Sequence, residues 1–196
     1  MFEEKKRKFL EEWEKAKRTG DADEPIIELI DFLNTHPDIY TTSSCSGRIT
    51  LSVSPLKGKK YEHFFLKRWH RTVSYEELKE VLKEYEEKQY KGILWLRMNP
   101  FGLHLCCRNL EIAKKLLKIA IEAGLKYSGI LELENRIMLG IFGIDRLEMA
   151  IGDNGRIFAN EETIKRNLEI ANIRLEKNFE RIDRFFKLLK EKLFSK

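Results

Sequence analysis

The sequence contains few of the residues that build disulfide frameworks or metal sites. Its 196 residues include only three cysteines, Cys45, Cys106 and Cys107. An odd number without paired spacing argues against a disulfide framework and predicts a reducing, cytoplasmic location. Neither Cys-x-x-Cys nor His-x-x-x-His occurs, so the sequence predicts no metal site.

Long apolar runs and nucleotide-binding motifs are also missing. No segment has the run of apolar residues that a membrane span needs, and residues 1–6 do not resemble a signal peptide. No Gly-x-Gly-x-x-Gly follows a predicted strand, and there is no Walker loop. We therefore expect neither a membrane protein nor a doubly wound nucleotide-binding domain.

Charge, by contrast, is abundant. Charged residues make up 35% of the chain, and Gln89 is its only glutamine. This balance is typical of thermophilic proteins. The net charge of +5 equals the excess in residues 57–71, which hold one acid, Glu62, and six basic residues: Lys57, Lys59, Lys60, Lys67, Arg68 and Arg71. Aromatic residues are interleaved with these cations, a composition that suits RNA phosphates and stacked bases. A solvated strand edge guarded by lysines is the alternative, and composition alone does not decide between them.

Hydrophobic periodicity predicts an α+β fold in a single domain of residues 1–196, with a mixed, largely antiparallel sheet. Helix signals occur near the N-terminus, in residues 2–18 and from Asp23 to Pro37. Further helices are expected from the caps Ser74, Asn109 and Asn160, the last of them long. Strands are predicted over residues 49–53, 62–69, 93–97, 103–107, 127–133, 136–141 and 147–151.

The most informative segment is Thr41-Thr42-Ser43-Ser44-Cys45-Ser46-Gly47-Arg48. We expect it to form a polar loop between a helix and a strand. Hydroxyls and a glycine allow a tight turn with open backbone N–H groups, and an adjacent arginine can bind a carboxylate or phosphate. The run has more polar groups than a turn requires, which favours a site in which Ser44 to Arg48 take part. Cys45 fits a small buried residue better than a nucleophile.

Residues 42–49 resemble the hallmark of the tRNA wybutosine-synthesizing protein 3 family. Other blocks typical of this family follow in order, and the resemblance spans roughly residues 23–193. These blocks are Trp69-His70, Asn99-Pro100-Phe101, Leu103-His104, Arg108, Ser128-Gly129-Ile130, Ala171-Asn172, Asn178 and Arg181. Asn99 stands where the family usually has an acidic residue, so we assign Asn99 no catalytic role.

The resemblance implies an S-adenosylmethionine-dependent methyltransferase with a fold unlike the doubly wound methyltransferases. Its substrate would be the wyosine-type base at position 37 of phenylalanine tRNA, and the methyl acceptor a ring nitrogen, N-4. We expect a cytoplasmic monomer that binds the anticodon arm and needs no metal. The expected catalytic residues are His70, His104, Ser44 and Arg48, and the expected donor contacts are Ser46, Gly47, Ser128, Gly129 and Asn172. The expected RNA contacts are Lys57, Lys60, Lys67, Arg68, Trp69, Arg71 and Arg108.

Several of these residues also fit purely structural roles. His70 is a plausible proton acceptor or merely lies at a strand end, and His104 lies in an apolar run where a histidine is often a hydrogen-bonded core residue. Arg108 fits a phosphate contact or the cover of a sheet edge. Asn172 and Asn178 lie mid-helix, where asparagine is unfavourable and requires a reason.

Two other functions compete with the methyltransferase. A noncatalytic RNA-binding module would hold an anticodon arm without binding S-adenosylmethionine. A cysteine-dependent hydrolase is disfavoured because no partner spacing surrounds Cys45.

Overall fold

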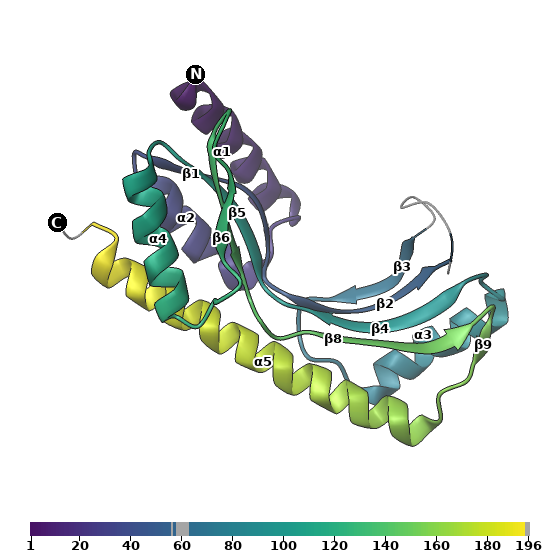
Figure 1. Ribbon diagram of the computed structural model, residues 1–196. Helices are drawn as coiled ribbons and strands as arrows, with labels where there is room; N and C mark the ends of the chain where they lie inside the picture. The colour runs from purple at the N-terminus through teal and green to yellow at the C-terminus, as the bar shows by residue number, and fades with distance from the viewer. Residues whose placement is uncertain (56, 58–62, 195–196) are drawn as a thin grey trace. The chain divides into compact units, whose positions relative to one another are not determined.

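The computed structural model describes residues 1–55, 57 and 63–194. Its internal contacts divide the chain into two compact units (Figure 1). Unit 1 comprises Met1–Ser46, Pro100–Ile144 and Asn178–Lys196, and unit 2 comprises Gly47–Asn99 and Asp145–Lys177. The α+β class and the long C-terminal helix, α5 (Glu161–Lys192), are confirmed. The expected single domain over residues 1–196 stays a prediction. None of the described helices is long and apolar enough to cross a membrane.

Unit 1 is built on a four-stranded antiparallel sheet in the order β1-β5-β7-β6. Its strands are β1 (Ile39–Cys45), β5 (Gly102–Cys107), β6 (Gly129–Glu132) and β7 (Ile137–Phe142). Alternate residues of the paired strands point to one face, and among them Leu103, Leu105 and Leu139 are fully buried. This face therefore forms the core side of the sheet.

Three helical segments supply the rest of the core of unit 1. They are α2 (Ile27–Thr35), which follows a 3₁₀ turn (Glu24–Ile26), α4 (Leu110–Glu122), and the part of α5 after residue 178. The first helix, α1 (Phe2–Thr19), packs instead against Tyr40, which follows the core residue Ile39 and so points to the opposite face. The sheet of unit 1 is therefore covered on both sides, with α1 over the side that the core leaves open.

Unit 2 contains a five-stranded antiparallel sheet in the order β3-β2-β4-β8-β9. Its strands are β2 (Arg48–Ser54), β3 (Phe64–Trp69), β4 (Ile93–Asn99), β8 (Leu147–Asp153) and β9 (Arg156–Ile157). Helix α3 (Tyr75–Lys88) and the first part of α5 lie on one side of this sheet (Figure 1). The ring of Tyr85 in α3 lies 3.3 Å from the position a Cβ would take at Gly152, and Gly152 is paired with the buried Leu94. The helices therefore cover the face that carries Leu94.

The prediction of a loop over residues 41–48 was wrong for most of that run. Thr41 to Cys45 belong to β1 and Arg48 begins β2, so only Ser46 and Gly47 separate the two strands. Gly47 has φ +100°, a conformation that glycine adopts without strain. Three hydroxyls of this strand have partners: Thr41 Oγ1 accepts from Asn34 Nδ2 at 3.1 Å, Thr42 Oγ1 donates to the His104 carbonyl at 3.2 Å, and Ser43 Oγ lies 2.9 Å from His104 Nδ1.

Candidate functional site

The end of β1 in unit 1 is held by two side chains that bind the backbone of Ser46. The backbone N–H of Ser46 donates to Asp23 Oδ2 at 2.7 Å, and its carbonyl accepts a bond from Asn178 Nδ2 at 2.8 Å. The other amide atom of Asn178, Oδ1, accepts the N–H of Phe101 at 2.6 Å. Asn178 is only 1% exposed. It therefore joins the end of β1 to the start of β5 through backbone groups that water does not reach.

The close packing around Asn178 explains why residue 143 is a glycine. A Cβ on Gly143 would lie 2.9 Å from Asn178 Oδ1 and 2.8 Å from Pro100 Cβ, closer than side-chain atoms normally approach. The N–H of Gly143 also donates to the carbonyl of Phe101 at 2.8 Å. Only a residue without a side chain permits this close packing around Asn178.

A serine and a histidine meet on the sheet face of unit 1 that lies opposite the core. Ser43 Oγ is 2.9 Å from His104 Nδ1, and a β-bulge after Thr41 places Ser43 directly across from His104. The His104 ring packs edge-on against Phe142, with ring centroids 5.3 Å apart. If Nδ1–H donates to Ser43, the Nε2 lone pair of His104 is left to accept a proton. In that tautomer the pair has the parts of a general base.

A cavity of about 300 Å³ lies between α1 and β1 in the same unit. The rings of Phe9 and Trp13 and the hydroxyl run of residues 41–44 form part of its wall. Three carboxyl residues complete the polar part of the lining: Glu12, Asp21 and Asp23. Negative charge beside aromatic rings and hydroxyls suits a cationic, polar ligand, whereas it repels a phosphate.

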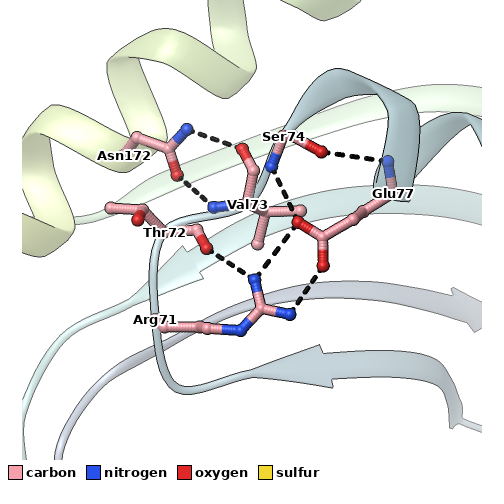
Figure 2. A network of polar contacts seen from close by, with 6 residues as sticks. All are labelled: Arg71, Thr72, Val73, Ser74, Glu77 and Asn172. Atoms are coloured by element: carbon pink, nitrogen blue, oxygen red, sulfur yellow. Dashed lines mark hydrogen bonds and ion pairs between the residues drawn. The ribbon is translucent and has the colours of Figure 1, made fainter.

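In unit 2, Asn172 fixes the segment that precedes α3 (Figure 2). Its Oδ1 accepts the N–H of Val73 and its Nδ2 donates to the Val73 carbonyl, both at 2.9 Å. Next to Val73, Ser74 and Glu77 form a reciprocal capping box at the start of α3. Arg71 binds both carboxylate oxygens of Glu77 and, with the Ser74 N–H, lowers the pKa of Glu77 to about 2. The network orders the start of α3 and neutralises Arg71.

The face of the unit 2 sheet opposite α3 carries arginines stacked on aromatic rings. Arg48 and Arg68 both lie over Phe65, with the guanidinium carbons 5.1 and 4.9 Å from the ring centroid. Arg97 lies over Trp95 at 4.6 Å and also binds Glu148 at 2.8 Å. We call this surface the Phe65–Trp95 face; its members are Arg48, Thr50, Ser52, Phe65, Arg68, Trp95 and Arg97.

Comparison with known proteins identifies the chain. It matches the model of the methyltransferase TYW3 family over residues 4–191. The chain belongs to this family. A relative from Pyrococcus abyssi, named tRNA(Phe) 7-((3-amino-3-carboxypropyl)-4-demethylwyosine(37)-N(4))-methyltransferase 1, is 36% identical over 97% of this chain and 96% of its own length. A Methanocaldococcus jannaschii protein that carries the same name without a number is 35% identical, over 97% of each chain.

Solved structures agree with the family assignment. A Pyrococcus horikoshii protein has a TM-score of 0.87 at 36% identity, over 95% of this chain and 94% of its own. An Aeropyrum pernix protein has a TM-score of 0.72 at 25% identity, over 88% of this chain and 99% of its own. The chain is thus an N-methyltransferase of the wybutosine pathway of tRNA modification, and its fold differs from the doubly wound methyltransferases.

Among the donor contacts predicted from the TYW3 family, Ser128 and Asn172 hold backbone groups of other segments. The Ser128 hydroxyl donates to the Leu125 carbonyl at 2.7 Å and accepts the Phe142 N–H at 3.2 Å. Asn172 holds Val73, as described above. Gly129, by contrast, has no atom within 4 Å of the position a Cβ would take, so a ligand can approach its backbone. The role of each in donor binding stays a prediction.

The predicted RNA contacts differ in the charge they offer. Arg71 is paired with Glu77, and Arg108 is paired with Glu3 and Asp38. Lys57, Lys67 and Arg68 are exposed, and no carboxylate in the described part of the chain pairs with them. Trp69 is only 6% exposed, so its ring belongs to the core of unit 2 rather than to an RNA surface. Lys60 lies outside the described residues.

The remaining predicted catalytic residues and the thiols are placed as follows. His70 directly follows β3 and is half-buried, Ser44 lines the cavity beside α1, and Arg48 lies on the Phe65–Trp95 face. Cys106 and Cys107 are buried, and burial raises the pKa of the Cys107 thiol to about 12. A thiol with this pKa is protonated near neutrality and is a poor nucleophile.

Sequence reasoning missed the partners of these residues. Ser43 was not chosen as a site residue, although it lies in the hallmark run, because its pairing with His104 depends on a bulge. Phe65, Trp95 and Arg97 were missed although a signal was present. The alternation of Arg48, Thr50, Ser52 and Ser54 along β2 marks a polar sheet face, which the neighbouring strands must share.

Proposed function

We propose that this protein transfers a methyl group from S-adenosylmethionine to N-4 of 7-(3-amino-3-carboxypropyl)-4-demethylwyosine at position 37 of tRNA(Phe). One observation carries the proposal: relatives named for this reaction match nearly the whole chain, with 36% identity over 97% of it. Because both the hallmark run and the C-terminal helix lie inside the match, the resemblance is not confined to one motif.

The acidic cavity of unit 1 fits the donor. S-adenosylmethionine carries a sulfonium, an ammonium and a carboxylate group and so has a net positive charge, and when bound it supplies a methyl group already activated for transfer. Glu12, Asp21 and Asp23 surround the cavity with negative charge, and Trp13 and Phe9 offer flat apolar walls. Asp23 also holds Ser46, so the same carboxyl residue orders the hallmark run. The roles expected for Ser46 and Gly47 in donor binding stay predictions.

The acceptor nitrogen must lose a proton as its new bond to carbon forms. In our proposal His104 Nε2 takes that proton, while Ser43 holds Nδ1 and thereby the orientation of the ring. The carbon–sulfur bond breaks, the nitrogen–carbon bond forms, and the proton remains on the imidazole until water removes it. The protein's part is alignment and proton acceptance. His70 stays the alternative acceptor.

Donor binding separates this proposal from a noncatalytic RNA module. We expect calorimetry to show S-adenosylmethionine binding to the wild-type protein, and the variant Glu12→Gln to bind it several-fold more weakly, because one charge that attracts the cation is lost. Glu4→Gln, which removes an exposed carboxylate of α1 outside the cavity lining, is the matched control and should bind normally. A wild-type protein that binds tRNA but no donor would favour the RNA module.

A further inference from the structure

The Phe65–Trp95 face is a sheet surface without a helical cover from its own unit. Both described helical segments of unit 2, α3 and the first part of α5, lie on the other side (Figure 1). The open side carries aromatic and cationic side chains in register: Ser52 is paired with Phe65 on one neighbouring strand and with Trp95 on the other. Thr50 is likewise flanked by Arg68 and Arg97. Rings and guanidinium groups therefore form two adjacent rows across three strands.

The charge of this face is not balanced by the residues around it. Arg97 is compensated by Glu148. Arg48 and Arg68 share the Phe65 ring, and neither forms an ion pair within the residues that the structure describes. Two guanidinium groups against one ring repel each other, so an anion placed beside them gains from both.

Two buried polar atoms on the same face lack partners. Arg48 Nε and Thr50 Oγ1 form no hydrogen bond with any described residue, and Thr50 is fully buried. An unsatisfied buried polar atom costs free energy, so each of these two atoms calls for a partner such as an ordered water or a bound ligand. Both atoms lie on alternate residues of β2 and so point to the face that carries the stacked arginines.

We propose that the Phe65–Trp95 face binds single-stranded nucleotides of the tRNA, with bases stacked on Phe65 and Trp95 and phosphates bound by Arg68 and Arg48. This inference rests on the proposed function for the identity of the RNA. Aromatic rings on a sheet are a common platform for unpaired bases, and guanidinium groups supply both stacking and phosphate contacts. Lys67 of the edge strand β3 is exposed but is paired with the buried Leu51, so it points away from this face and is not part of the proposed site.

RNA fits this surface better than an apolar protein segment. Arginines without carboxylate partners attract an anion, and the half-exposed rings beside them offer a flat surface for stacking. A nucleotide chain supplies both at regular spacing, whereas an acidic peptide supplies only the charge. The donor fits this face less well than a nucleotide chain, because its sulfonium, ammonium and carboxylate groups sum to a net positive charge, whereas each nucleotide carries a negative one.

Binding of an unmodified, fluorescent tRNA(Phe) anticodon stem-loop tests this inference without methyl transfer. Phe65→Leu keeps the apolar volume but removes the ring, and we expect binding about 5- to 100-fold weaker with an unchanged salt slope. Arg68→Gln should lower the log–log salt slope by about one unit. Phe158→Leu and Arg166→Gln, at exposed positions outside the face, are the matched controls and should bind as wild type. Thermal melts of all four variants check the fold.

Competition between inorganic polyphosphate and the stem-loop separates the contribution of base stacking from that of phosphate binding. It carries phosphates without bases, so we expect Phe65→Leu to leave its binding nearly unchanged while Arg68→Gln weakens it. Wild-type stem-loop affinity in folded Phe65→Leu, or an unchanged salt slope in Arg68→Gln, would overturn the inference. If Phe65→Leu does not fold, the salt slope of stem-loop binding in Arg68→Gln alone tests the inference. A protein that binds the stem-loop through this face yet methylates no tRNA would contradict only the proposed function.

Discussion

At the scale of single residues, Asn172 and Asn178 show what a side-chain amide does in the middle of a helix. Each uses both of its polar atoms on backbone groups of another segment: Asn172 on Val73 in unit 2, and Asn178 on Phe101 and Ser46 in unit 1. The poor helix propensity of asparagine is offset by bonds that no aliphatic residue can form. The sequence showed that these residues needed a reason but not which backbone groups they bind.

Replacing Asn178 by alanine should destabilise unit 1. The change leaves the buried Phe101 N–H and Ser46 carbonyl without partners, which costs about 2–4 kcal/mol of unfolding free energy. Asn167→Ala on the same helix is the control. Its amide donates to the Thr163 carbonyl of its own helix, and alanine favours the helix, so we expect little change or a slight gain. Denaturant unfolding of both variants measures the difference, and equal stabilities would contradict the role assigned to Asn178.

His104 gives the catalytic prediction at this scale. Converting it to alanine should slow single-turnover methylation about 10²- to 10⁴-fold, because the proton acceptor is lost. Ser43→Ala should slow it less, since the ring remains but its tautomer is no longer fixed. Donor affinity, measured by calorimetry, should stay near wild type in His104→Ala, because His104 is not among the residues that line the cavity. Wild-type turnover in a folded His104→Ala protein would remove this residue from the mechanism and leave His70 as the candidate.

At the scale of elements, local signals predicted helices better than strands. The caps Ser74 and Asn109 start their helices where the sequence indicates, because each capping bond is formed within three residues. The hydroxyl run of β1 could not be recognised as a strand, because its polar side chains are satisfied by Asn34 and His104, the latter far away in the chain. Trp69 was misplaced for a related reason: its register opposite Ile49 turns it into the core.

The start of α3 predicts an acid-dependent stability. Arg71 and the cap hold the pKa of Glu77 at about 2, below the ordinary value near 4.5. The folded state therefore binds fewer protons than the unfolded state in this range. The stabilisation is present above pH 4.5 and is lost as the pH falls towards 2. Denaturant unfolding between these pH values should show a smaller loss of stability in Glu77→Gln than in wild type, whereas equal losses would show that the contact is not formed in solution.

At the scale of the whole molecule, charge of opposite sign is concentrated in different places. The cavity of unit 1 is lined by acids, whereas the open sheet face of unit 2 carries arginines without carboxylate partners among the described residues. The sequence located the basic excess in residues 57–71, since those cations are close in sequence. It could not show that Arg71 is neutralised by Glu77, or that Arg48 and Arg97 belong to the same surface, because strand pairing assembles that surface.

Methyl transfer to a defined tRNA is the most direct test of the proposed reaction. Purified protein, S-adenosylmethionine and tRNA(Phe) carrying 7-(3-amino-3-carboxypropyl)-4-demethylwyosine at position 37 would be incubated, and the digested nucleosides analysed by mass spectrometry. We predict that this nucleoside gains the mass of one methyl group, that fragmentation places the group on N-4 of the tricyclic base, and that tRNA(Phe) with unmodified guanosine at position 37 gains none. An unchanged nucleoside despite donor binding, or a methyl group at another position, would contradict the account.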